Sequence, residues 1–439
     1  MQSTRTSRFS YLAIYCALIA FAIPWQRVSW IHKGITPFHF VNAVLLTLAL
    51  LPFLNRKPVK FHFLAPLFVY LLGTVLGMFS SKFVLYNIYT IGQDLYLYIW
   101  FVLMCVVLAV ERNEKYLVVA WMVAAMIVVF VTADGSIFET VDVSRLEFSF
   151  RNPNRAAAYF VLGIFLSFHP VVPWVLRFVI VGLLVKALLA TGSAGGLLAF
   201  LAGAGVLVVI WFYLRYGDRL RLQAVMLIGL CGILLVGALL MTGEGLRQGY
   251  SDATGQAGAR VDRSADVRQM IWANGLATFR EHPLGIGPGS FFQQFPTEFG
   301  RDSKNVELHS DWFSTLVERG VVGIAGLVGL IVAIGIKTLK LIGLGILENN
   351  DKRYSLWIAA LAGATVSYIA LSFTHEVLHH ETFWLVLALI MASIRRLNMP
   401  GNDEYDGVVK RRMSYVPVST PINQETLAEP RHAREPEIR

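Results

Sequence analysis

Residues 193–214 read SAGGLLAFLAGAGVLVVIWFYL and contain no charged side chain. An apolar run of about 20 residues can cross the hydrocarbon core of a bilayer as a single helix. Similar runs recur along the chain, in which 56% of all residues are hydrophobic and 15% are charged. Soluble domains carry about 25% charged residues. The pattern therefore predicts an integral membrane protein without a sizeable soluble domain.

The apolar runs predict an all-α polytopic membrane protein. One helix of about 20 residues on each run gives about twelve transmembrane spans. Residues 1–397 are therefore expected to form one membrane domain. Residues 398–439 are polar, with scattered prolines and no hydrophobic period, which predicts a disordered tail. The expected spans are 9–30, 38–54, 61–80, 93–110, 115–133, 155–171, 173–190, 193–214, 222–242, 314–338, 355–373 and 377–395.

The short loops predict an orientation, because lysine and arginine are enriched in short cytoplasmic loops. With the spans above, the basic residues of these loops fall on one side, so both termini and the tail are expected in the cytoplasm. Topology then explains most of the net charge of +9, which gives no reason to expect nucleic acid as a partner. The residues are Arg5, Arg8, Arg56, Lys57, Lys60, Arg215, Arg219, Arg221, Lys337, Lys340, Lys352, Arg353, Arg395 and Arg396.

The opposite side carries several polar segments. It holds the segment SRLEFSFRNPN (144–154), the turn TGSAG (191–195), a long loop at about residues 243–313 and the loop THEVLHHET (374–382). The long loop is rich in arginine, which permits two interpretations. These arginines could form an anion-binding surface, or they could belong to a solvated loop of mixed charge. The arginines are Arg247, Arg260, Arg263, Arg268, Arg280 and Arg301.

Part of the long loop has the pattern of an amphipathic helix. Residues 267–291 read VRQMIWANGLATFREHPLGIGPGSF, with apolar residues at helical spacing. We expect this helix to lie along the membrane surface and to end at Pro283. The following GIGPG sequence (285–289) predicts a tight turn at which the backbone can approach a ligand, although the same glycines could form a plain turn.

His309 lies at the outer end of the next predicted span. One interpretation is a capping or packing histidine, because Ser310 and Asp311 are typical of a helix N-terminus. The other is a general base, since imidazole titrates near neutrality and can take a proton from a hydroxyl. Arginine binds phosphate oxygens through two parallel hydrogen bonds. The combination suggests that a sugar hydroxyl attacks a carbon bearing a phosphate leaving group.

No carboxylate pair with metal-ligand spacing accompanies His309, so we expect neither a metal nor a cofactor. Three other titratable residues of the outer face, Glu376, His379 and His380, belong to a loop that is separate in sequence.

Five segments resemble the successive motifs of the O-antigen ligase and polymerase superfamily. They are FRNPNRAAAYFVLG (150–163), TGSAGGLLAF (191–200), R-x-x-x-W at Arg268 and Trp272, HPLGIGPGSF (282–291) and LHSDWFSTLVERGVVG (308–323). They follow the family's order and spacing over residues 145–335. Members are GT-C-like transferases of the bacterial inner membrane. They use undecaprenyl diphosphate-linked glycans on the periplasmic side and need no metal.

The resemblance implies roles for particular residues. His309 would activate the acceptor hydroxyl, and Arg268 would bind the donor diphosphate. Further contacts with the diphosphate or the glycan are expected from Arg151, Asn154, Arg155, Arg260, Gly287 and Gly289.

The chain departs from the family pattern at one position. Where many members have Ser-Arg-Gly, this chain has Ser193-Ala194-Gly195, so one phosphate-binding arginine is absent. Lys186 could supply the missing charge, or its ammonium group could extend to the outer lipid headgroups.

The expected function is that of an O-antigen ligase. It would move a preassembled glycan from undecaprenyl diphosphate to the lipid A–core oligosaccharide, with inversion, at the periplasmic face and among membrane lipids. One alternative is a polymerase of the same superfamily, which transfers to another lipid-linked repeat. Members that glycosylate proteins usually carry an extra soluble C-terminal region. Transporters and flippases tend to show internal repeats and charged sites near the bilayer midplane.

Overall fold

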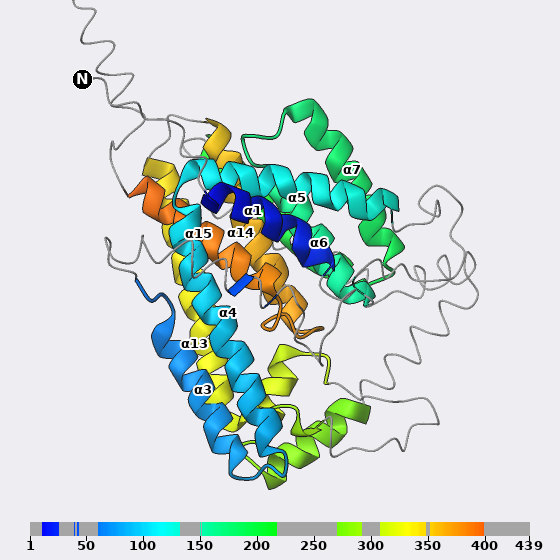
Figure 1. Cartoon of the computed structure of the whole chain (residues 1–439), viewed down its shortest axis with the longest axis vertical. Coiled ribbons are helices and arrows are strands. Elements are labelled where there is room, and N and C mark those ends of the chain that lie inside the picture. The colour runs from blue at the N-terminus through cyan, green and yellow to red at the C-terminus, as the bar shows by residue number, and fades with distance from the viewer. Residues whose placement is uncertain are drawn as a thin grey trace, which may run out of the picture. The chain divides into compact units, whose positions relative to one another are not determined.

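A computed structural model describes residues 11–25, 39, 42–43, 60–131, 150, 152–216, 270–291, 308–347 and 352–398 (Figure 1). All regular secondary structure in these ranges is helical, which confirms the predicted all-α class for this part of the chain. Five of its helices are long and apolar enough to cross a membrane: α4, α5, α8, α13 and α14. The predicted span 222–242 and most of 38–54 lie outside the described residues. The count of twelve spans and the disordered tail therefore stay predictions.

Most helices coincide with predicted apolar runs, although α4 begins at Val84, ahead of the predicted span 93–110. Residues 270–281 are also helical and end just before Pro283, as the amphipathic pattern predicts. The bounds are α1 (Tyr11–Ala22), the 3-10 helix η1 (Ile23–Trp25), α3 (Leu64–Met78), α4 (Val84–Leu108), α5 (Glu111–Val131), α6 (Pro153–Leu166), α7 (Trp174–Ala190), α8 (Ala194–Tyr216), α13 (Asp311–Leu347), α14 (Lys352–Ser372) and α15 (Glu381–Leu397).

Glycines bring two pairs of helices into close contact. α3 and α13 lie side by side (Figure 1), and a Cβ added at Gly73 of α3 would overlap the backbone of Gly323 in α13. α8 and α14 meet in the same way at Gly203 and Gly363. Small residues at such contacts let two backbones approach each other, which is how helices gain packing energy inside a bilayer.

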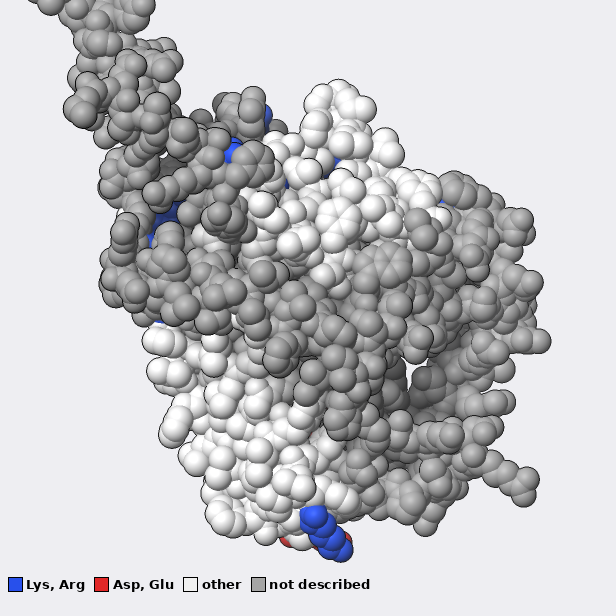
Figure 2. Space-filling model, viewed as in Figure 1, with Lys and Arg blue, Asp and Glu red and all other residues white. Residues whose placement is uncertain are grey.

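The described surface is mainly apolar. Exposed large side chains include Phe68 of α3, Leu85 of α4 and Leu339 of α13. In the view of Figure 2, most described residues are neither acidic nor basic. An apolar surface of this kind is expected where helices face lipid tails, since those tails offer no partner for a charge. The chain is a multi-pass membrane protein.

Charged residues hold one end of the helical assembly together. Glu114, near the start of α5, is fully buried and pairs with Arg396 near the end of α15. His169, in the turn between α6 and α7, has its Nε2 atom 3.6 Å from the Glu114 carboxylate. A buried carboxylate needs a charged partner such as Arg396, because burial alone strongly disfavours its charge. The helix ends that meet here are those assigned to one side of the membrane by their basic loops.

Candidate active site

The predicted GIGPG turn packs against a kink in α13. At Gly320 the backbone adopts φ 66° and ψ −163°, which interrupts the helix. The N–H of Ile286 donates to the carbonyl of Val317 at 3.2 Å, and that of Gly287 donates to the carbonyl of Glu318 at 2.9 Å. Backbone groups that the kink releases therefore find partners in the turn, as buried polar groups require.

Only glycine suits the kink at position 320. This combination of φ and ψ is essentially confined to glycine. A Cβ there would also overlap the backbone of Pro283 and Leu284, which cannot move aside as a flexible side chain could.

We expect Gly320→Ala to destabilise the protein by at least about 1–3 kcal/mol, from backbone strain alone. The measurement is the thermal unfolding midpoint of the purified protein in detergent. Gly335→Ala is the matched control, because it lies in the same helix and a Cβ there meets nothing within 4 Å. That control should be neutral or slightly stabilising, since alanine favours a helix over glycine. Equal midpoints for the two variants would contradict the kink geometry.

His309 lies two residues before the start of α13 and has an unusual backbone conformation. Its φ is 52°, in the left-handed region that residues other than glycine rarely adopt. Such conformations persist where the surroundings enforce them, and they occur often at functional sites. The side chain is partly buried, between the buried residues Leu308 and Ser310.

A tryptophan ties the surface helix to this segment. Trp272 donates a hydrogen bond from Nε1 to the carbonyl of Leu308 at 3.1 Å, and its ring stacks on Phe313 at 4.4 Å between centroids. A small apolar cluster lies beneath, formed by Ile271, Ile286, Phe291, Leu308 and Val317. The helix 270–281, the GIGPG turn and the start of α13 therefore form one packed unit beside His309.

The loop between α14 and α15 contacts the His309 segment directly. The carboxylate of Asp311 accepts the N–H of Val377 at 2.8 Å and that of Leu378 at 3.3 Å. In return, the N–H of Asp311 donates to the carbonyl of His375 at 3.3 Å. From sequence, this loop looked separate from His309. The structure shows that residues about 66 positions apart meet here.

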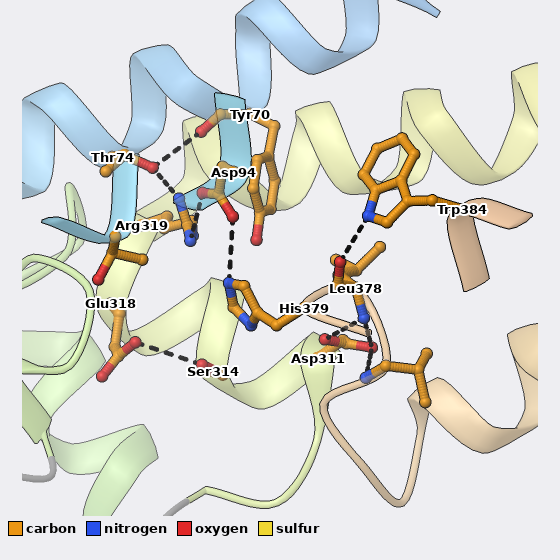
Figure 3. A network of polar contacts seen from close by, with 12 residues as sticks. Tyr70, Thr74, Asp94, Asp311, Ser314, Glu318, Arg319, Leu378, His379 and Trp384 are labelled. Carbon is orange, nitrogen blue, oxygen red and sulfur yellow. Dashed lines mark hydrogen bonds and ion pairs between the residues drawn. The ribbon is translucent and has the colours of Figure 1, made fainter. Parts of the chain in front are cut away.

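A second set of buried polar contacts surrounds Arg319 (Figure 3). Arg319 of α13 is 2% exposed, and its Nη2 atom is 3.0 Å from the Asp94 carboxylate of α4. The same guanidinium donates to the Thr74 hydroxyl and lies over the Tyr70 ring at 4.2 Å. The other oxygen of Asp94 is 3.1 Å from Nε2 of His379.

The stretch from α7 into α13 resembles a known protein family. Residues 178–328 match the family model described as O-antigen ligase. The match supports assignment of the chain to the O-antigen ligase superfamily, as the motifs predict. These ligases and polymerases resemble glycosyltransferases and act on lipid-linked glycans. The matched stretch includes the TGSAG turn, the GIGPG turn and His309, but it ends before the loop 373–380. No curated protein matches the chain significantly.

The NPN motif and the TGSAG turn meet near the loop 373–380. The Oδ1 atom of Asn154 accepts a hydrogen bond from the Ser193 hydroxyl at 2.8 Å, which joins the NPN motif to the TGSAG turn. A Cβ added at Gly195 would lie 3.2 Å from Nε2 of His375 and would overlap the Thr374 hydroxyl. Asn154 and His309 are therefore connected through the TGSAG turn and the loop 373–380.

The other predicted residues have different surroundings. Arg155 acts electrostatically on Glu381, whose carboxylate is 2.8 Å from Nε2 of His39. Lys186 is exposed on α7, close to its C-terminal end. Three predicted phosphate-binding residues, Arg151, Arg260 and Arg268, lie outside the described residues.

The glycines of the GIGPG turn are tightly enclosed. Gly287 and Gly289 have φ of 84° and 72°, and added Cβ atoms would overlap Asn87 and Tyr86 of α4, respectively. Their close packing is against the protein itself, and their predicted contact with a glycan or diphosphate stays a prediction.

Asp94 and Arg319 were not recognised from the sequence, and His379 was placed in a separate loop. A signal for the first two was present, since both lie within predicted spans and ionisable residues inside a membrane usually have a functional or structural partner. Among the described residues, no group of three or more His, Cys, Asp and Glu side chains is arranged to hold a metal ion. Independence of metals stays a prediction.

Proposed function

We propose that this protein is an O-antigen ligase. It transfers a preassembled glycan from undecaprenyl diphosphate to the lipid A–core oligosaccharide, at the periplasmic face of the bacterial inner membrane. The observation that carries the proposal is the setting of His309. This histidine has a left-handed backbone and lies within the stretch that matches the family. Its neighbours Leu308 and Asp311 are hydrogen-bonded to Trp272 and to the loop 373–380, respectively.

The proposed reaction is a single displacement. His309 takes the proton from an acceptor hydroxyl, and the hydroxyl oxygen forms a bond to the anomeric carbon of the donor. The bond from that carbon to the diphosphate oxygen breaks, and its electron pair leaves with the diphosphate. Because attack and departure occur on opposite faces, the anomeric configuration inverts. No metal or cofactor takes part.

Arginines are proposed to stabilise the departing diphosphate. Their guanidinium groups keep their charge at any accessible pH and match pairs of phosphate oxygens. Fixed positive groups aimed at developing negative charge are an effective form of catalysis. The proposed residues are Arg268, Arg151, Arg155 and Arg260, with Asn154, Lys186 and the backbone of Gly287 and Gly289 as further donor contacts.

Deleting the gene from its bacterial host is expected to separate a ligase from a polymerase. Both would use the same donor and the same histidine, so they differ in the product that accumulates. Without a ligase, full-length glycan should accumulate on undecaprenyl diphosphate, and the lipid A–core should carry none. The measurement is mass spectrometry of the lipid-linked and core-linked glycans.

A plasmid carrying the wild-type gene is the control for this experiment and should restore glycan on the lipid A–core. Accumulation of single repeat units on the lipid carrier would instead identify the protein as the polymerase.

A further inference from the structure

The loop 373–380 is fastened at neighbouring positions to Asp311 of α13 and to Asp94 of α4. Asp311 binds the backbone N–H groups of Val377 and Leu378, as described above. The next residue, His379, faces the carboxylate of Asp94, 3.1 Å away. Leu378 is also held from the other side, because its carbonyl accepts a hydrogen bond from the Trp384 indole at 2.7 Å. Three consecutive residues of the loop are thereby fixed (Figure 3).

Asp94 cannot easily move away from this arrangement. It is 6% exposed, and one of its oxygens is already paired with the buried guanidinium of Arg319. Arg319 is fixed in turn by Thr74 and Tyr70 of α3. Buried ions remain charged only when they are paired, so separating Asp94 from Arg319 would cost free energy. Asp94 is therefore held in position by Arg319, and its second oxygen faces His379.

Asp311 and Arg319 belong to the same helix, α13. Asp311 binds the loop directly, and Arg319 holds Asp94, which pairs with His379 of the loop. Asp311 is two residues after His309, and Arg319 directly precedes the Gly320 kink. A force that displaces the loop at His379 would be transmitted through Asp311 to the backbone of His309. The left-handed conformation of His309 leaves little freedom to absorb such a shift.

We propose that His379 is a positioning residue of the transfer reaction, whose ion pair with Asp94 keeps the loop 373–380 and, through Asp311, the His309 segment in the reactive arrangement. This inference rests on the proposed function, in which His309 is the base. His379 itself touches neither the donor nor the acceptor in this scheme.

The ion pair predicts a pH dependence of stability. The groups facing His379 are Asp94 from α4, Arg319 and Asp311 from α13, and Glu376 from its own loop. Burial by itself lowers the pKa of His379, but the Asp94 carboxylate raises it by more, so the pKa lies above its ordinary value of 6.5. A raised pKa means that protonation favours the folded state. The stabilisation is complete below pH 6.5 and is lost as the pH rises through the raised pKa.

The test combines two measurements on the purified full-length protein in detergent. The first is the thermal unfolding midpoint across the pH range in which histidines titrate. The second is the kcat and KM of glycan transfer over the same range. The variants are His379→Gln, which cannot become charged, and Asp94→Asn. Asp94→Glu retains the carboxylate, and His62→Gln is a control histidine in the segment that precedes α3.

For the wild type, the unfolding midpoint should fall as the pH rises through the pKa of His379. His379→Gln and Asp94→Asn should lose this fall of the unfolding midpoint with pH, whereas Asp94→Glu and His62→Gln should retain it. In His379→Gln, we expect kcat to fall about 10–100-fold with little change in KM, because small misplacements of a catalytic group are costly. In the wild type, kcat should decrease at alkaline pH over the range in which the unfolding midpoint falls. This decrease should be absent in His379→Gln.

Three outcomes decide against the inference or the function beneath it. An unchanged pH dependence of unfolding in His379→Gln would overturn the ion pair. A lost pH dependence with wild-type kcat would show that His379 is purely structural and would overturn the positioning role. A wild-type protein that transfers no glycan would instead remove the proposed function and the positioning role with it, while the unfolding data would still establish the ion pair.

Discussion

Replacing His309 with alanine is expected to reduce glycan transfer about 10²–10⁴-fold, the usual effect of losing a general base. The acceptor hydroxyl would then have to lose its proton to water, which is a weaker base than imidazole. The measurement is single-turnover transfer from a purified lipid-linked donor to the lipid A–core acceptor. Expression and membrane insertion should remain normal, because the side chain lies outside the apolar spans.

The left-handed backbone at His309 calls for a second variant. Alanine tolerates φ 52° poorly, so part of its effect could come from a shifted backbone. Asparagine is among the residues that adopt this region most readily and provides no comparable base. His309→Asn should therefore be as inactive as the alanine variant while keeping a wild-type unfolding midpoint. Transfer at a near wild-type rate in His309→Asn would assign His309 a capping role instead.

Arg268→Ala is expected to reduce transfer about 10²–10³-fold, the typical cost of removing one group that stabilises developing negative charge. The sequence places Arg268 four residues before Trp272, in the R-x-x-x-W motif. Trp272 is anchored to the carbonyl of Leu308, next to His309.

The nature of the substitution should matter at position 268. Lysine keeps the charge but lacks the planar fork that binds two oxygens at once, so Arg268→Lys should recover only part of the rate. Arg280→Ala is the matched control, since Arg280 is exposed on the helix 270–281. The kinetics should be measured against donor concentration. Equal rates for the Arg268 and Arg280 alanine variants would contradict a diphosphate-binding role.

Hydropathy predicted some helix ends closely. The predicted span 173–190 corresponds to α7 at Trp174–Ala190, and the span 193–214 corresponds to α8 at Ala194–Tyr216. These helices are apolar and mostly not buried, so composition alone reports where they begin and end. The turn between them contains Gly192 and Ser193, which local sequence signals also identify.

Hydropathy failed where polar residues are buried in protein. Span 93–110 was placed too late, because α4 begins at Val84. Asn87 and Thr90 precede the predicted span and Asp94 lies just inside it. Their polarity lowers the hydropathy of these first turns, yet all three residues are buried in the structure. Their burial depends on contacts with distant segments, such as the GIGPG turn and Arg319. A single-sequence pattern contains no information about such contacts.

The candidate site shows the same division. The motifs identified His309, Asn154 and the glycines, because each has a recognisable local signature. The kink at Gly320 was not predicted, since hydropathy does not sense a backbone dihedral angle within an apolar helix. The loop 373–380 was assigned no part in the site, because its link to His309 is a tertiary hydrogen bond from Asp311.

The number of residues from Asp311 to Gly320 sets the relative orientation of two groups of contacts. Asp311 at one end grips the loop 373–380, and Arg319 and Gly320 at the other end meet α4 and the GIGPG turn. Inserting or deleting one residue between them would rotate one end by about 100° relative to the other. The length of this stretch therefore matters more to these contacts than the identity of the exposed side chains along it. A homologue with a different spacing must build this end of the molecule in another way.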